Sequence, residues 1–310
     1  MPEKKPTGPN ADELAKNLKA ALAQRRPRPW KAILAALALS TFALILFAVV
    51  LYPRRPPEPL QVLALDALAT PDEVLHISAR LMAPANDTSP RSLHKHKIVF
   101  HEPPAIFQGA DKPREVSGSS DERGQALVDW ETPKKAIAEF QATYIDLTAR
   151  PARHTDHARI FVTPARTPIL VVDTDDLLSA DVVNEKAAAK LSEAAKDGWQ
   201  IVYLAPAAAK PRAFSKARER LTQQPKLPRG PILGRFHAPT ADTVEAARRE
   251  LLQSIRTRFQ GPIQALVNSA AAAQSSKEAG VNTILIGAAD APAGVLRVAS
   301  WSDVPLRLDK

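Results

Sequence analysis

The stretch ILVVDTDDLLSAD, from Ile169 to Asp181, decides how the second half of the chain is interpreted. Four apolar residues lead into Asp173, and two more carboxylates, Asp175 and Asp176, follow within three positions. Short apolar runs rich in Val and Ile are typical of buried strands. In open α/β sheets, functional side chains gather at the carboxyl ends of the strands. The stretch therefore predicts a central strand that presents the acidic pair Asp173 and Asp175 at a sheet edge.

Strands and helices alternate after this point. The expected strands are PILVVDT, QIVYLA, PILGRF, IQALVN and NTILIG. The expected helices between them are EKAAAKLSEAAKDGW, AFSKARERLTQQ, TADTVEAARRELLQSIRTRF and AAAAQSSKEAG. Such alternation is typical of a parallel sheet with helices on both faces. We therefore expect a Rossmann-like α/β domain over residues 166–310.

The order of these segments resembles the haloacid dehalogenase (HAD) superfamily, in which a hydrophobic strand ends in D-x-D. ILVVDTDDLL is similar to the SDIDDTI signature of the actin-patch-type phosphatidate phosphatases, which are related to the lipins. IVYLAPA stands where that family has YVSGSP, and LPRGPILGRF resembles its LPxGPLLLR. RRELLQSIRTRFQGPIQALVNS resembles its helix leading into LVGDS, so the resemblance covers roughly residues 165–290.

The resemblance implies a role for each matching residue. Asp173 would attack phosphorus to form an aspartyl-phosphate, and Asp175 would protonate the leaving group and then activate water. Asp173 and Asp175 would also hold Mg²⁺. No Lys stands at the family's phosphate-binding position, and the nearest cation is Arg248, whose guanidinium would hold phosphate instead.

Other positions depart from the family pattern. Leu177 replaces the Thr of the first motif, Ala205 replaces the Ser or Thr after the second strand, and Asn268-Ser269 stand at the late acid. Because phosphoryl transfer depends on electrostatic stabilisation, these losses predict a catalytically impaired phosphatase-like domain that acts as a binding or scaffold module. One alternative is an active Mg²⁺-dependent phosphatase on phosphatidate or another phosphomonoester. Another is that DTDD is only an acidic strand end.

Residues 60–165 contain short segments in which apolar and polar residues alternate. They are VLHISARLM, HKIVF, ALVDW, AEFQATYID and ARIFVTP, and turn-rich stretches separate them. Several short strands at this spacing predict an Ig-like β-sandwich, which also precedes the phosphatase domain in the family named above. This region holds most of the histidines, such as His94 and His96, and their spacing favours surface residues over a metal site.

The N-terminal part predicts membrane attachment. Residues 1–31 form a basic tail with a short amphipathic helix, and residues 32–52 carry no charge over a length that suits a transmembrane helix. Eight Lys and Arg residues precede this segment, which favours a cytoplasmic N-terminus and an extracytoplasmic (in a bacterium, periplasmic) remainder. A Pro-rich linker follows over 53–59. We therefore expect membrane lipids as partners.

Composition excludes several classes of site. The chain has no Cys, which excludes disulfides, zinc–thiolate centres and a Cys nucleophile. The net charge of +9 is unevenly spread, with a net +5 in residues 1–31, and no aromatic-interleaved basic stripe accompanies it, so we expect no nucleic-acid partner. A phosphorylated small molecule or lipid remains the expected ligand class. Taken together, the sequence predicts an α/β HAD-like domain preceded by an Ig-like β-sandwich and a single transmembrane helix.

Overall fold

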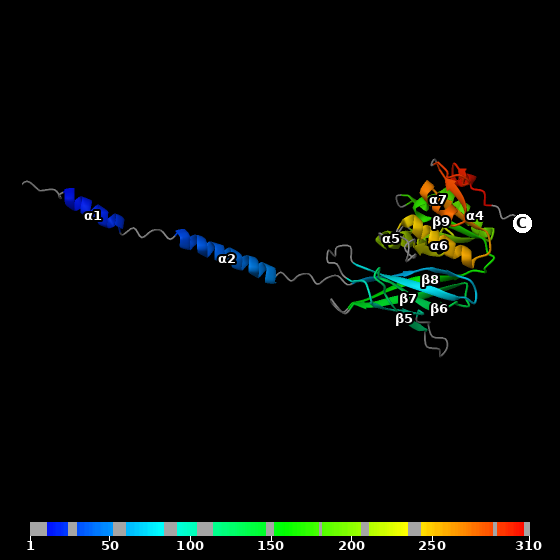
Figure 1. Cartoon of the computed structure of the whole chain (residues 1–310), viewed down its shortest axis with the longest axis horizontal. Coiled ribbons are helices and arrows are strands. Elements are labelled where there is room, and N and C mark those ends of the chain that lie inside the picture. Colours follow the sequence, from blue (N-terminus) through cyan, green and yellow to red (C-terminus); the bar gives the residue numbers. More distant parts are fainter. Residues whose placement is uncertain are drawn as a thin grey trace, which may run out of the picture. The chain divides into compact units, whose positions relative to one another are not determined.

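The structure is a computed structural model of the whole chain, shown in Figure 1. It describes residues 11–23, 30–51, 60–83, 92–103, 114–146, 152–179, 182–205, 211–234, 243–287 and 290–306. The chain divides into two compact units, Met1–Pro56 and Pro57–Lys310.

The first unit contains α1 (Ala11–Ala23) and α2 (Trp30–Leu51). In the described part of the chain, no helix is both long and apolar enough to cross a membrane. This finding contradicts the predicted transmembrane helix over 32–52, and with it the single-pass topology and the extracytoplasmic placement of the rest of the chain.

Two sheets form the first part of the second unit. The three-stranded sheet is antiparallel and contains β1 (Gln61–Leu65), β3 (Val74–Met82) and β6 (Gln125–Glu131). The five-stranded sheet has the order β2 (Ala67–Ala69), β8 (Ala152–Val162), β7 (Ile137–Asp146), β4 (Lys97–His101) and β5 (Glu115–Ser119). Alternate side chains of both sheets enclose one apolar core, which includes Ile77, Phe100, Trp130 and Phe140.

A six-stranded parallel sheet forms the second part. Its order is β13 (Ile232–Gly234), β12 (Gln200–Ala205), β9 (Ile169–Asp173), β14 (Ile263–Val267), β15 (Asn282–Ile286) and β16 (Leu296–Val298). Four helices accompany it: α4 (Glu185–Lys196), α5 (Pro211–Thr222), α6 (Val244–Arg258) and α7 (Ala270–Glu278). The central β9 confirms the strand predicted from ILVVD.

Successive residues of β9 point to opposite faces of the sheet, as the period of a strand requires. Leu170 and Val172 share a core with α4, whereas Ile169 and Val171 share a core with Leu252 and Ile255 of α6. Asp173 continues the second set and so lies on the α6 side. The sequence therefore places its strand-terminal acid beneath one particular helix.

Helix ends follow local sequence signals. The side chain of Asn184 accepts hydrogen bonds at the start of α4, and Thr243 and Ser269 do the same for α6 and α7. α4 ends at Lys196, and Gly198 shortly after it adopts a φ of +92°, a left-handed conformation typical of helix ends.

The predicted fold class is wrong as a whole. No described helix spans a membrane. The five-stranded sheet is mixed, because β2 pairs in parallel with β8, whereas an Ig-like sheet is antiparallel. A further two-stranded sheet joins β10 (Leu178–Ser179) to β11 (Val182–Val183). The structure shows a parallel sheet with helices, together with mixed and antiparallel sheets.

Hydrogen bonds join the two parts of the second unit. The buried carboxylate of Asp66, between β1 and β2, accepts from the backbone N–H of Arg159 and of Ile232, both at 2.9 Å. Arg218 of α5 donates to the carbonyl of Ala64 at 2.7 Å and pairs through one amino group with both carboxylate oxygens of Asp156. The strands of the first part are therefore fixed against β13 and α5.

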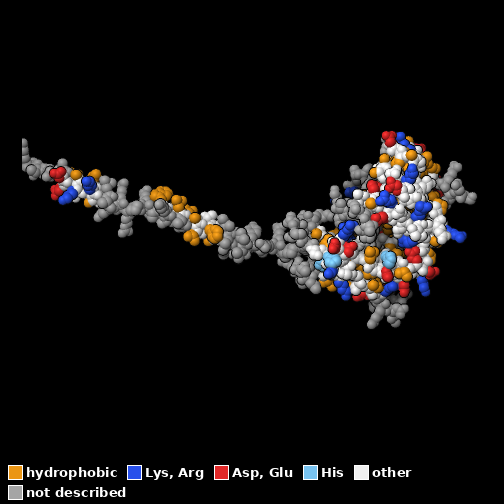
Figure 2. All heavy atoms as spheres, in the orientation of Figure 1, with side chains coloured by type: hydrophobic (Ala, Val, Ile, Leu, Met, Phe, Trp, Pro, Cys, Tyr) orange, Lys and Arg blue, Asp and Glu red, His pale blue; other side chains and the backbone are white. Residues whose placement is uncertain are grey.

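Charged side chains of both signs are interspersed on the face of the second unit that Figure 2 shows. This face therefore carries no broad surface of a single sign.

Candidate active site

Asp173 ends the central strand of the parallel sheet. Its neighbours are β12 and β14, and Leu204 is its register partner on β12. The residue is 4% exposed, so its carboxylate is nearly removed from water. A buried carboxylate is costly unless cations or hydrogen-bond donors surround it. Asp173 is the residue to which the family resemblance assigns the attack on phosphorus.

Arg248 of α6 supplies the cation. One terminal nitrogen of its guanidinium donates to Oδ1 of Asp173 at 2.8 Å, and the other donates to Oδ2. The Arg248 side chain is 1% exposed. This bidentate pairing of a guanidinium with a carboxylate is stronger than neutral hydrogen bonds. It also fixes the orientation of the two planar groups relative to each other.

A second acid extends the pair. Glu245, one turn earlier on α6, places Oε2 3.4 Å from Nε of Arg248. The same oxygen accepts a hydrogen bond of 2.7 Å from the hydroxyl of Ser275 on α7. Arg248 therefore lies between two carboxylates, and the network links β9, α6 and α7.

The short helix α3 (Thr174–Leu177) follows Asp173 directly. Thr174 is 1% exposed, and its hydroxyl has no hydrogen-bond partner among the described residues. The backbone of Asp175 lies in α3, but its side chain lies outside the described part of the structure. Its predicted roles as acid, base and metal ligand therefore stay predictions.

The positions that depart from the family pattern serve the fold. Leu177 packs in the apolar core beside Leu170 and α4, and Ala205 ends β12 in the same core. Ser269 accepts a hydrogen bond from the backbone N–H of Ala272 and so begins α7. These positions add no described donor or acid beside Asp173.

Glu278, the nearest acid along the chain after that point, is engaged at the surface. It accepts from the side chain of Gln274 at 2.9 Å and from Arg249 at 2.8 Å. The hydrogen bond from Gln274 and the guanidinium of Arg249 lower the pKa of its carboxyl group. Glu278 therefore neutralises an exposed arginine.

The described residues do not fit a magnesium ion at Asp173. Mg²⁺ is bound through carboxylate oxygens and water in a near-octahedral arrangement. Here both oxygens of Asp173 already accept from a guanidinium that carries a full positive charge. Moreover, the described residues contain no group of three His, Asp or Glu side chains placed to share a cation.

Sequence reasoning singled out Asp173 and Arg248 but missed that they bind each other. It also missed Glu245 and Ser275. One signal was available in the sequence, because Arg248, Leu252 and Ile255 are spaced by four and three along a helix and share one face. An arginine on an apolar face requires a buried acid as partner.

Comparisons with known proteins assign no family. No family model matches the sequence, and a comparison with curated proteins gives no match. Among solved structures, the chain is similar to D,D-heptose 1.7-bisphosphate phosphatase from B. bronchiseptica, solved with magnesium and phosphate. Identity is 13%, with 44% of this chain and 94% of that chain covered and a TM-score of 0.33.

Two sialyltransferases also match part of the chain. The enzyme from Photobacterium damsela is 13% identical over 71% of this chain and 42% of its own, with a TM-score of 0.20. The 2,6-sialyltransferase of Photobacterium sp. JT-ISH-224 is 9% identical over 72% and 41%, with a TM-score of 0.21. At these scores none of the three likenesses identifies an activity.

Proposed function

We infer that residues 166–310 are a catalytically impaired relative of the HAD phosphatases and serve as a binding or scaffold module. The observation that carries this inference is the buried, two-pronged pair between Asp173 and Arg248. It lies where the motif DTDD would supply the attacking carboxylate. Leu177, Ala205 and Asn268-Ser269 stand where the family pattern has a Thr, a Ser or Thr, and an acid.

The pair opposes nucleophilic attack. A carboxylate oxygen attacks phosphorus only when it can approach the reacting atom closely. Separating a buried ion pair by removing one partner costs about 3–5 kcal/mol, and displacing Arg248 from Asp173 would carry a cost of the same order. If this cost is added to the activation barrier, it slows the reaction by roughly 10²- to 10⁴-fold.

The pair also opposes the metal ion of the family mechanism. Arg248 keeps its positive charge at all physiological pH values, so a cation approaching Asp173 meets repulsion from the guanidinium. The two oxygens that would bind the cation are hydrogen-bonded already. The positive charge at this position is thus supplied by the chain itself.

A phosphatase assay of the full-length protein tests the inference. Wild type and D173N are incubated with para-nitrophenyl phosphate and with phosphatidate in detergent micelles, with and without Mg²⁺. We expect both proteins to release phosphate at the same background rate, because the carboxylate of Asp173 is not available. Circular dichroism of D173N shows whether the variant is folded.

Mg²⁺-dependent turnover that D173N abolishes would overturn the inference and establish an active phosphatase. Turnover that persists in D173N would indicate a contaminating enzyme, and repurification to constant specific activity would expose it. R249M, which removes an exposed arginine beside Arg248, serves as the matched surface control.

A further inference from the structure

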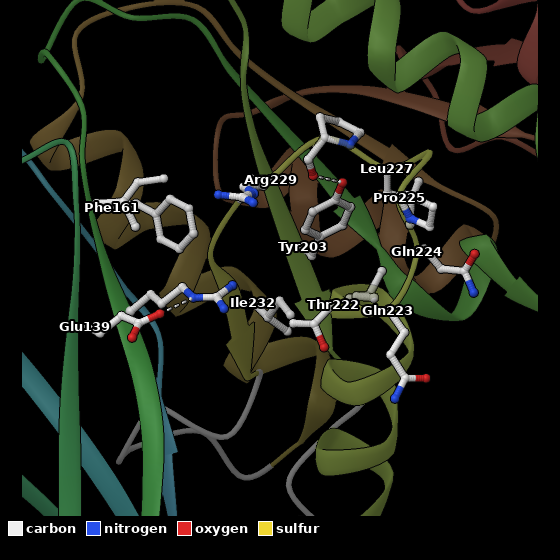
Figure 3. Close-up of a pocket in the computed structure, with 15 residues that line it drawn as sticks. Glu139, Phe161, Tyr203, Thr222, Gln223, Gln224, Pro225, Leu227, Arg229 and Ile232 are labelled. Atoms are coloured by element: carbon white, nitrogen blue, oxygen red, sulfur yellow. Dashed lines mark hydrogen bonds and ion pairs between the residues drawn. The ribbon is translucent and has the colours of Figure 1, made fainter. Parts of the chain in front are cut away.

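One cavity of the second unit is lined by residues other than Asp173. It has a volume of about 810 Å³ and opens between β7 and β8 on one side and the segment from Leu221 to Gly230 on the other (Figure 3). Tyr203 of β12 and Ile232 of β13 line its inner part. Its size falls within the roughly 300–1,000 Å³ that small-molecule sites occupy.

Positive charge predominates in this cavity. Two arginines line it, Arg159 of β8 and Arg229 of the loop before β13, against one acid, Glu139. Glu139 accepts from Nε of Arg159 at 3.3 Å, and both side chains are substantially exposed. An exposed pair of this kind is worth at most about 1 kcal/mol, so an incoming anion can compete for Arg159.

Arg229 has no hydrogen-bond or ion-pair partner among the described residues. In Figure 3 its guanidinium lies between the rings of Phe161 and Tyr203. A guanidinium presents several N–H donors in one plane and matches the oxygens of phosphate or carboxylate. The cavity therefore contains a cation with donors available for an anionic group.

The loop that carries Arg229 is fixed on both sides. The hydroxyl of Tyr203 donates to the carbonyl of Pro228 at 2.7 Å, and burial raises the pKa of Tyr203, which keeps this donor protonated. On the other side, a Cβ at Gly230 would lie 2.1 Å from the carbonyl oxygen of Ile201. The backbone at Arg229 is therefore held before any ligand arrives, which lowers the entropic cost of binding.

Apolar side chains complete the lining. Phe161, Ile137, Leu227 and Pro225 border the cavity together with the polar side chains of Thr222 and Gln224. Ligand sites commonly combine an apolar wall with a few placed polar groups. Here the apolar wall suits an organic ring or chain, and the arginines suit its charged end.

We propose that this cavity binds a small organic anion, a compound with an apolar part and a phosphate or carboxylate group. Arg229 holds the anionic group, Arg159 assists after leaving Glu139, and the wall formed by Phe161 and Ile137 contacts the apolar part. The site is separate from Asp173 and does not depend on whether the acid is catalytic.

Binding of three matched probes to the full-length protein tests the proposal. The probes are phenylphosphonate, benzoate and benzyl alcohol, which share a ring and differ in charge, and none contains a hydrolysable phosphate ester. Ligand-observed NMR titration measures each affinity. We expect phenylphosphonate or benzoate to bind and benzyl alcohol to bind far more weakly, with the tighter anion identifying the phosphate or the carboxylate class.

Substitutions locate the site. R229Q should weaken anion binding roughly 10- to 100-fold, because it removes a charge-assisted hydrogen-bond donor. R166Q removes the same charge from an exposed arginine outside the cavity and should leave the affinity unchanged. I137E, at an exposed position of the wall, should abolish anion binding by repulsion.

Three results would overturn the proposal: equal binding of benzyl alcohol and the anions, equal effects of R229Q and R166Q, or no binding of any probe at millimolar concentration. None of these results bears on the phosphatase assay, so the two inferences fail separately.

Discussion

An arginine lies at the carboxyl edge of the parallel sheet, and another lies at the amino end of β13. The two differ in burial and in pairing. Arg248 is 1% exposed and is bound by two carboxylates. Arg229 is exposed at a cavity and has no partner among the described residues. The same functional group is therefore a structural cation in one place and a free donor in the other.

The difference shows why position in a fold does not identify a ligand site by itself. Parallel sheets place their usual sites at the carboxyl edge, and Asp173 lies there. Yet Arg248 satisfies that acid from within the chain. The free donor is found instead beside the edge strand, where the resemblance drew attention to LPRGP as a motif without assigning it a role.

Of the changes considered, removing Arg248, the partner of Asp173, should reduce the free energy of unfolding most. R248M leaves a buried carboxylate unpaired, and we expect the free energy of unfolding to fall by about 3–5 kcal/mol. Urea denaturation followed by circular dichroism measures the loss. D173N/R248M removes both charges from the pair and should recover a substantial part of it.

The double-mutant cycle excludes a simple packing effect. If the loss in R248M came only from the missing side-chain volume, D173N/R248M would be at least as unstable as R248M. If the free energy of unfolding fell by less than about 1 kcal/mol in R248M, Arg248 would not be a structural cation for the buried carboxylate of Asp173.

Substitution of Asp66, which lies close to the cavity at Arg229, should reduce stability by a smaller amount. Its carboxylate accepts from the N–H of Ile232, which also lines the cavity. In D66N the amide oxygen accepts from one backbone N–H, and the amide nitrogen faces the other, so we expect a loss of about 1–3 kcal/mol at acidic pH. Urea denaturation at several pH values measures it.

The pH dependence of this loss has a defined sign. Burial raises the pKa of Asp66 above its ordinary value of 3.8, although the N–H groups of Ile232 and Arg159 and the charge of Arg218 lower it. The folded protein then binds more protons than the unfolded chain, so this group's contribution to stability falls as pH rises from 3.8 through the folded pKa. The advantage of wild type over D66N should therefore shrink as pH rises. An advantage that grows with pH would contradict this assignment.

Local features of the fold were predictable from sequence. The apolar run before Asp173 predicts a buried strand, and every residue of β9 (Ile169–Asp173) is buried. The end of α4 also has a local cause, because the φ of +92° at Gly198 is unfavourable for residues other than glycine. The predicted membrane span and fold class were wrong. The parallel pairing of β2 with β8 joins residues about 90 positions apart, and no local pattern encodes it.

The candidate site was predictable only in part. The strand pattern placed Asp173 at the sheet edge, but its partner depends on how α6 packs over β9, because Asp173 and Arg248 are 75 positions apart in the sequence. The face of α6 that carries Arg248 predicts burial of that arginine and does not say which acid receives it. The cavity at Arg229 is lined by four separate segments of the sequence, so it appears only in the folded chain.

The smallest loss of stability is expected for Arg249, the residue that follows Arg248. Arg249 follows Arg248 on α6 but points to solvent, where it pairs with Glu278 at 2.8 Å and both side chains are about two-fifths exposed. Exposed pairs of this kind contribute little, because water and salt screen them. R249M should therefore leave the urea midpoint within experimental error of wild type, whereas the same change one residue earlier should lower it strongly. Equal losses in R248M and R249M would mean that α6 tolerates no loss of arginine at either position. Burial of the Asp173–Arg248 pair would then not be what distinguishes Arg248 from the exposed Arg229.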